Sequence, residues 1–502
     1  MPIITCWKPC TAKKNWKRVK SFSLIQIKKI VCFFGLLLFA LLVKAQDEAR
    51  PNILFIAVDD LRPELGCYGA SHIKSPHIDQ LATEGMVFNR SYCNVPVCGA
   101  SRASLLSGIR PDRQRFLNFS CWQDKDVPGV VSLPMYFKNN GYRTLSLGKI
   151  YHHREDGKGS WSEHPWYPSG DWEGWQAYIT EEAQKQIEPR KGGVGINGVS
   201  FEAPEGPDHI YPDGVIAQQA IKKLNDLKTS QQPFFLALGF LKPHLPFNAP
   251  KKYWDMYDFE KIQLPDNMRK PKDAPDECMH PFGELRNYTD VPDKGPMDKE
   301  FMRKLIHGYY ACVSYTDAQI GKVLNELERL GLAENTVVIL WGDHGWHLGE
   351  HDLWCKHCNF EKVLHTPLIL KAPGKGNGQR TEALVEYVDI YPTLCELAGL
   401  EKPFHLQGRS MVPLLDNPEL PWKEEVYSRW IDGETVITQT HTYTEWFRKG
   451  EEKGYTRMLY NLVADPEETV NISEKQENKE LVTELQDKLY RHMKKRNKLV
   501  IK

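Results

Sequence analysis

The stretch "NILFIAVDD", Asn52 to Asp60, is an apolar run of strand length that ends in two adjacent carboxylates. It is too short for a helix and is typical of a central strand in a parallel sheet. Asp59 and Asp60 then fall at the carboxyl end of that strand, and open α/β sheets bind their ligands at this edge. The stretch therefore predicts both an α/β fold and the edge at which a site would form.

Helix and strand signals alternate from there along most of the chain. "SPHIDQLATEG" has a capping Ser75, a proline at the first helical position and a closing Gly85, which together predict a helix. Three further helix and strand pairs follow: 132–142 with 144–149, 214–227 with 233–240, and 308–331 with 336–345. This alternation favours a large, mostly parallel sheet flanked by helices.

The alternation stops near Leu400, where a proline-rich loop begins. The tail offers strand-like pieces and a charged amphipathic helix from Lys479, which predict a small antiparallel sheet with one helix. We therefore expect a catalytic domain over 46–402 and a C-terminal subdomain over 403–502.

The amino end resembles an export signal. A basic stretch precedes the apolar run Ile30–Val43, which is too short for an ordinary transmembrane helix. Residues 1–45 are predicted to be a cleaved signal peptide, with a retained anchor as the alternative. The protein is then secreted or periplasmic and meets the membrane only through this leader during export.

The charge balance bears on nucleic-acid binding, and the cysteine count bears on disulfide pairing. Lys and Arg together number 65, as do Asp and Glu, so no overall field favours nucleic acid, and none is expected as a partner. Nine of the twelve cysteines follow the leader, an odd number, so at least one is unpaired. "CKHC", Cys355 to Cys358, is interpreted as either a short-loop disulfide or two free thiols.

Several chemically active residues follow the predicted strands. Lys149 ends one strand, Lys242 and His244 follow another, and Asp343 and His344 follow a third. Because the carboxyl ends of parallel strands share one edge, we expect these side chains to converge with Asp59 and Asp60.

Cys98-Gly99-Ala100-Ser101-Arg102 fits the Cys-x-Pro/Ala-Ser-Arg signature of the sulfatases. Other segments resemble that family in the family's order, among them "GYRTLSLGKIYH", "FLKPHLPF" and "WGDHGWHLGEHDLWCKH". The versions "DDLRPELGCYG", "KPHLPF" and "GDHGWHLGEH" are most similar to iduronate-2-sulfatases. The resemblance implies an alkaline-phosphatase-like sulfatase fold and hydrolysis of sulfate monoesters.

The resemblance also implies roles for individual residues. A separate maturation enzyme would oxidise Cys98 to formylglycine, whose hydrate is the nucleophile. Arg102 would hold that nucleophile, Lys149 would neutralise sulfate oxygen, and His152 would take the proton of the second hydroxyl. His244 would be the general acid, and Lys356 would bridge to the sulfate. The implied Ca²⁺ shell is Asp59, Asp60, the residue at 98, Asp343 and His344.

The sugar is the least determined feature. Trp346, His357 and the loop Arg113–Trp122 are candidate substrate contacts, whereas solvated or structural roles suit Lys242 and His347 at least as well. His357 stands where an iduronate-2-sulfatase is expected to have tyrosine, so both a glycosaminoglycan with 2-sulfated iduronate and algal ulvan stay open, with an exo-acting enzyme preferred. The alternatives are a phosphodiesterase or phosphonate hydrolase of the same superfold and a non-catalytic polysaccharide-binding protein.

Overall fold

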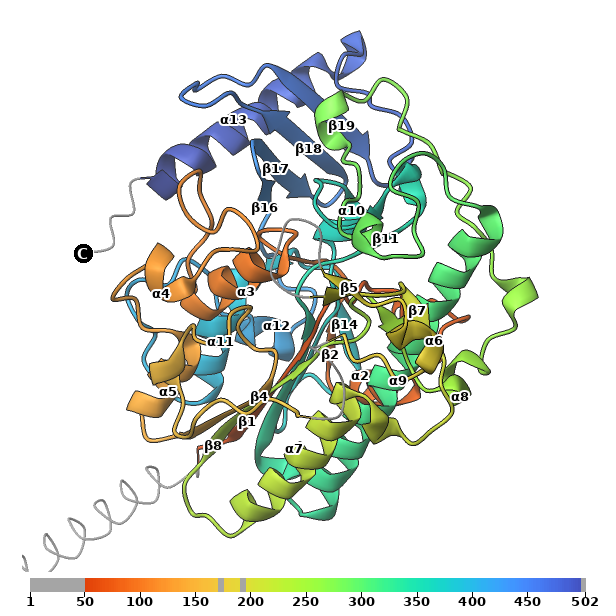
Figure 1. Ribbon diagram of the computed structural model, residues 1–502. Helices are drawn as coiled ribbons and strands as arrows, with labels where there is room; N and C mark the ends of the chain where they lie inside the picture. Colours follow the sequence, from red (N-terminus) through yellow and green to blue (C-terminus); the bar gives the residue numbers. More distant parts are fainter. Residues whose placement is uncertain (1–49, 170–175, 190–195, 498–502) are drawn as a thin grey trace, which may run out of the picture. The chain divides into compact units, whose positions relative to one another are not determined.

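A seven-stranded sheet lies at the centre of the protein in the computed structural model, which describes residues 50–169, 176–189 and 196–497 (Figure 1). The predicted signal peptide lies outside the described residues. The strand order is β14 (Gln379–Thr381), β2 (Met86–Phe88), β13 (Leu368–Lys371), β10 (Thr336–Gly342), β1 (Asn52–Val58), β8 (Phe234–Phe240) and β4 (Arg143–Gly148). β10, β1, β8 and β4 run parallel, and β13 pairs antiparallel with both of its neighbours. The predicted mostly parallel sheet is confirmed.

Helices cover both faces of this sheet, because β1 is apolar on both sides. Leu54, Ile56 and Val58 belong to a buried cluster that includes residues of α2 (Pro76–Glu84), α7 (Pro212–Lys228) and α9 (Lys299–Arg329). The alternate residues Ile53, Phe55 and Ala57 belong to a second cluster, with residues of α3 (Cys98–Ser107), α5 (Leu133–Asn139) and α11 (Ile390–Leu397). The continuous apolar run is thus a strand buried on both faces, which Figure 1 shows between the two helical layers.

Ser75 precedes α2 as predicted, but its side chain makes no capping hydrogen bond to the helix. Its hydroxyl instead accepts from the backbone of Gly66 at 3.0 Å and contacts Asp79 Oδ1 at 3.2 Å. The backbone amides of His77 and Ile78 donate to Asp317 of α9. The carboxylate of Asp317 on α9 therefore accepts the hydrogen bonds of backbone amides at the start of α2.

The tail forms a four-stranded antiparallel sheet with one helix, as predicted. Its strands are β16 (Glu425–Trp430), β17 (Gly433–Thr438), β18 (His441–Trp446) and β19 (Thr456–Asn461), and the helix is α13 (Lys479–Asn497). One face packs on α13 through Val436, Leu459 and Leu485. Ile437 and Tyr460 share the buried cluster of Phe55. A boundary after residue 402 stays a prediction, since the small sheet shares its core with the large one.

All nine described cysteines are buried and free, so the two-thiol interpretation of Cys355 and Cys358 applies. In the described part of the chain, no helix has the length and apolar character needed to cross a membrane.

Candidate active site

The carboxyl ends of four parallel strands bring the predicted residues together. Asp59 and Asp60 follow β1, and Asp343 follows the neighbouring β10. The backbone amide of Asp60 donates to Asp343 Oδ1 at 3.0 Å, and the amide of Asp59 donates to Phe240 O of β8 at 3.1 Å. Asp60 has a positive φ of 60°, which turns the chain sharply after the strand. The convergence expected from the sequence is present.

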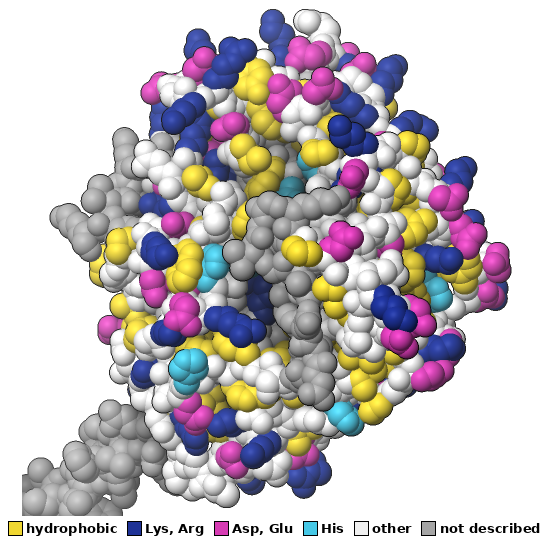
Figure 2. Space-filling model, viewed as in Figure 1, with side chains coloured by type: hydrophobic (Ala, Val, Ile, Leu, Met, Phe, Trp, Pro, Cys, Tyr) yellow, Lys and Arg dark blue, Asp and Glu magenta, His cyan; other side chains and the backbone are white. Residues whose placement is uncertain are grey.

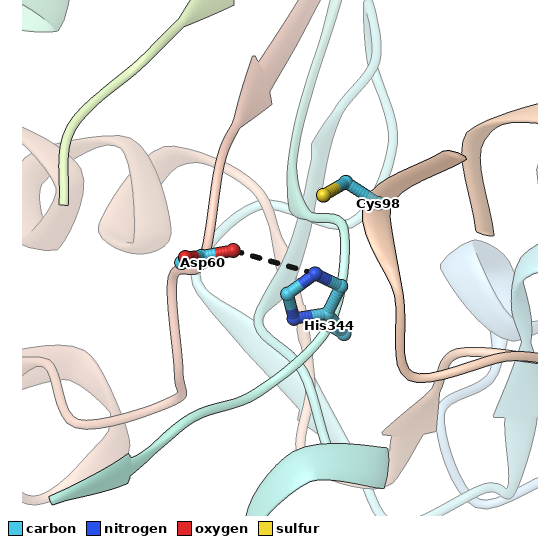
Figure 3. Close-up of side chains that lie close together, drawn as sticks. All are labelled: Asp60, Cys98 and His344. Carbon is cyan, nitrogen blue, oxygen red and sulfur yellow. Dashed lines mark ion pairs between the residues drawn. The ribbon is translucent and has the colours of Figure 1, made fainter. Parts of the chain in front are cut away.

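Three overlapping groups of side chains there could hold a cation, and one of them is Asp59, Asp60 and His244. Oxygen, nitrogen and sulfur ligand atoms of Asp60, Cys98 and His344 lie within 4.8 Å of one another, and the same holds for Asp59, Cys98 and Asp343. Figure 3 shows His344 facing Asp60, with Cys98 nearby; His344 Nε2 is 3.3 Å from Asp60 Oδ1. This Nε2 is buried and has no hydrogen-bond partner among the described residues. Three carboxylates beside an unpartnered imidazole nitrogen fit a divalent cation.

Arg102 fixes two of these carboxylates. Its side chain is fully buried, and it lies one helical turn after Cys98 on α3. Nη2 contacts Asp59 Oδ1 at 3.0 Å, and Nε contacts Asp343 Oδ2 at 2.9 Å. The two carboxylates raise the pKa of the guanidinium, although burial lowers it. Arg102 therefore stays charged and positions the acidic groups.

Cys98 is the first residue of α3 and is 3% exposed. Burial raises the pKa of its thiol, but Lys149, Lys356 and hydrogen bonds from His152 and His244 together hold that pKa well below its usual range. The positive end of the helix dipole adds to this field. The position therefore favours a negatively charged atom.

Lys149 and His152 approach this position from the end of β4. Lys149 Nζ pairs with Asp59 Oδ2, and both Lys149 and His152 line the cavity described below. The Nδ1 atom of His152 is buried without a hydrogen-bond partner among the described residues. Lys149 can therefore bind an anion, and His152 can accept a proton, on the same side of residue 98.

His244 and Lys356 are joined by a carboxylate that the sequence did not predict. Glu284 Oε1 is 3.1 Å from His244 Nε2 and 3.0 Å from Lys356 Nζ. Lys356 Nζ also contacts Asp60 Oδ1 at 2.9 Å. Burial lowers the pKa of His244, but Asp60 and hydrogen bonds with Cys98 and Glu284 raise it to about 10. "PFGELRN" carries no motif that would have indicated Glu284.

Lys242, whose role was left open, holds the loop that carries His244. The backbone amides of Leu241 and Lys242 donate to Asp213 at 2.8 Å each, and Lys242 Nζ donates to His244 O at 3.0 Å. The side chain is 1% exposed. His347 is also buried and lies 3.8 Å from Cys358 Sγ. Both side chains are buried, and neither lines the cavity beside Cys98.

A cavity of about 630 Å³ opens beside Cys98. Its wall includes Cys98, Phe119 of the Arg113–Trp122 loop, Glu284, Tyr288 and His357. The face in Figure 2 is hollowed at its centre, with Lys or Arg side chains visible inside.

Trp346 is not part of this cavity wall. Its side chain is 1% exposed, its ring centre lies 6.5 Å from that of His244, and Lys356 Nζ sits 5.0 Å above the ring. The substrate contact of Trp346 stays a prediction; in this structure the indole lies against His244 and Lys356 and does not line the cavity.

Comparison with known proteins gives a consistent result. The sulfatase family matches residues 51–400, and the family described as N-sulphoglucosamine sulphohydrolase, C-terminal, matches 349–495. Iduronate 2-sulfatase of Mus musculus is 36% identical over 415 residues, 74% of each chain. An ulvan-active sulfatase of Formosa agariphila is 27% identical over 467 residues, 89% of this chain and 82% of that one.

The fold is also shared with solved structures. The phosphonate monoester hydrolase of Agrobacterium radiobacter superposes with a TM-score of 0.72 at 21% identity, covering 89% of this chain and 96% of that one. Such a likeness concerns the fold, and the predicted sulfatase fold is confirmed by it together with the family match. The chain belongs to the sulfatase family and is a sulfuric ester hydrolase.

Proposed function

We propose that this protein hydrolyses sulfate monoesters on a sugar of an acidic polysaccharide, after a separate maturation enzyme has converted Cys98 to formylglycine. The observation that carries the proposal is the position of Cys98: it begins a buried helix and lies beside two lysines, three histidines and three carboxylates. A site for a sulfate ester needs this fixed positive charge beside the attacking atom.

The residues at the strand ends suit a Ca²⁺ ion, held by Asp59, Asp60, the residue at 98, Asp343 and His344. When bound, such a hard cation would neutralise sulfate oxygen and lower the pKa of a hydroxyl beside it. The hydrate of formylglycine would supply that hydroxyl. Arg102 keeps Asp59 and Asp343 in fixed positions, so the carboxylates do not need to rearrange during reaction.

Four residues that line the cavity are proposed to transfer protons and to neutralise charge on the substrate. His244, whose pKa is raised by Asp60 and by Glu284 in contact with its Nε2, would donate a proton to the departing sugar oxygen. Lys149 and Lys356 face sulfate oxygens from two sides of residue 98. After transfer of the sulfate to one hydroxyl of the hydrate, His152 would take the proton of the second hydroxyl; the C–O bond to the sulfate would then break, sulfate would leave, and the aldehyde would form again.

The substrate class follows from the relatives' names. One is named for the 2-sulfate of iduronate, a uronic acid, and the other for activity on ulvan. We infer an exo-acting enzyme on a sulfated uronate or on a rhamnose beside it. His357 and Phe119 on the cavity wall are the proposed sugar contacts. A secreted or periplasmic location, reached through residues 1–45, would give access to such chains.

Sulfate release tests this function. Formylglycine-bearing enzyme is incubated with heparan, dermatan and ulvan oligosaccharides, and desulfation is followed by NMR. We expect loss of sulfate from terminal residues, with far lower turnover of an aryl phosphate diester. Preferred turnover of the phosphate diester would favour a phosphonate or phosphodiester hydrolase, and binding without release would favour a non-catalytic polysaccharide-binding protein.

A further inference from the structure

Glu284 is the single carboxylate among the described residues that line the cavity. The basic side chains on this wall are Lys149, Arg154, Lys356 and three histidines. A carboxylate close to a sulfate group repels it, so Glu284 works against sulfate binding. Its presence on this wall calls for a second role, directed at a part of the substrate other than the sulfate.

The two oxygens of Glu284 have different surroundings. Oε1 is engaged by His244 Nε2 at 3.1 Å and Lys356 Nζ at 3.0 Å. Oε2 is buried and has no hydrogen-bond partner within the described ranges 50–169, 176–189 and 196–497. A buried carboxylate oxygen without a donor is costly, and it identifies a place where a donor from outside the protein would be stabilising.

We propose that Glu284 Oε2 binds a hydroxyl of the sulfated sugar, on the carbon next to the sulfate ester, while Oε1 holds His244 and Lys356 against the same sugar. The inference rests on the proposed function and deepens it, because it assigns a residue that recognises the sugar. A sulfate group offers no donor to Oε2, whereas a sugar hydroxyl does. His244 is assigned to the ester oxygen, so a carboxylate in contact with its Nε2 reaches the adjacent ring position.

The inference separates sugar sulfates from other sulfates. A site built to hydrogen-bond a substrate hydroxyl rejects the analogue that lacks it, because the buried partner is left unpaired. An aryl sulfate offers no such hydroxyl and gains nothing from Oε2. Glu284 therefore makes the enzyme selective for sugars through kcat/KM, in addition to any positioning through Oε1.

The test uses two sulfated sugars, methyl 2-O-sulfo-α-L-iduronoside and methyl 3-O-sulfo-α-L-rhamnoside. Each sugar is compared with its own deoxy analogues, in which a hydroxyl next to the sulfated carbon is replaced by hydrogen. Each is assayed with wild type, Glu284→Ala and Glu284→Gln, all quantified for formylglycine. Glu277→Gln, an exposed glutamate of the same loop, is the matched control. A double-mutant cycle then isolates the coupling between the carboxylate and the hydroxyl.

We expect wild type to lose at least about 100-fold in kcat/KM on one deoxy analogue of the sugar that it hydrolyses. Glu284→Ala should lose at least about tenfold more on the hydroxyl probe than on that analogue, a coupling of about 1.4 kcal/mol. If Glu284→Ala does not fold, the isosteric Glu284→Gln and the wild-type comparison carry the test.

Equal losses on both probes would overturn the inference and leave Glu284 with positioning alone. Wild-type turnover of all analogues at one rate would overturn it as well. Absence of sulfate release from either sugar by the formylglycine-bearing wild type would instead contradict the proposed function, and the inference with it.

Discussion

Two clusters of buried charged side chains in this protein differ in what lies next to them. At the carboxyl ends of the large sheet, Arg102 links carboxylates that follow two different strands, beside a cavity. Between β17 and α13, Glu434 accepts from Arg496 at 3.0 Å and from Arg429 at 3.2 Å. Candidate cation-binding groups occur in the first cluster, and none of the described residues around Glu434 forms one.

The comparison teaches that buried charge by itself does not mark an active site. Glu434 is neutralised by its neighbours, which fasten a helix to a sheet. Both clusters contain buried polar atoms without a hydrogen-bond partner among the described residues: His344 Nε2 and Glu284 Oε2 at the strand ends, and Arg429 Nη1 and Arg496 Nε beside Glu434. What distinguishes the strand-end cluster is the cavity beside it and the groups of side chains that could hold a cation, and the described residues around Glu434 have neither.

The largest expected effect separates Cys98 from Cys358. Cys98→Ala should lower kcat/KM on a sulfated sugar by about 10⁴-fold or more, because the nucleophile is lost, and should leave the free energy of unfolding nearly unchanged. Cys358→Ala is the matched control, because burial raises the pKa of the Cys358 thiol above its ordinary value and Cys358 does not line the cavity beside Cys98. Comparable turnover by Cys98→Ala and wild type would refute the assignment.

Breaking the second cluster should affect stability and not chemistry. Glu434→Ala leaves two buried guanidinium groups without their carboxylate and is expected to lower the free energy of unfolding by about 3–5 kcal/mol. Urea unfolding measures this, and kcat/KM at low temperature should stay within about twofold of wild type. Glu474→Ala, whose carboxylate is 73% exposed and pairs with Arg457, is the control and should cost about 1 kcal/mol or less.

Removing divalent cations should affect only the first cluster. Chelation with EGTA should abolish sulfate release and lower the free energy of unfolding by about 2.7 kcal/mol relative to enzyme with Ca²⁺ at a hundredfold excess over Kd. The Glu434→Ala variant should lose the same increment on chelation, since none of the described ion pairs joins Glu434 to Asp59, Asp60 or Asp343. Full activity after chelation, confirmed by elemental analysis, would argue against the cation site.

The smallest effect concerns Glu468, which joins the small sheet to the large domain. It accepts from the backbone of Glu361 at 2.7 Å and from Thr442 at 2.8 Å, and burial raises its pKa to about 8. Its protonated form stabilises the fold at low pH, and this stabilisation is lost as pH rises from the unfolded value near 4.5 through about 8.

Glu468→Gln has no proton to lose. The free energy of unfolding of this variant minus that of wild type should therefore increase by at least about 1.4 kcal/mol between pH 5 and pH 8. This increase corresponds to one pKa unit of the shift. Urea titrations at both pH values measure the difference. A gap that is constant with pH would show that Glu468 is ionised in the folded protein.

The sequence predicted the strand-end residues because their positions follow from periodicity. An apolar run of fixed length places Asp59, Asp60 and Asp343 at one edge whatever the details of packing. Such residues are determined by local pattern and topology, and both were correct here.

The remaining site residues depend on packing that no local pattern encodes. Glu284 comes from an irregular loop, and its contact with His244 depends on how that loop folds across the sheet. Trp346 follows β10 in a turn, where a change in backbone direction decides whether an indole faces the cavity or the core. Ser75 shows the same for capping, since Asp317 from another helix takes the role expected of it.

The central claim is that residue 98 reacts as formylglycine within the strand-end cluster. It is tested most directly by mass spectrometry of the peptide that carries residue 98, on preparations with different degrees of conversion, together with their rates of sulfate release from a sulfated uronic-acid oligosaccharide. The account predicts that the rate rises in proportion to the aldehyde fraction and vanishes when that fraction is zero. Full turnover by protein in which residue 98 is entirely cysteine would contradict it.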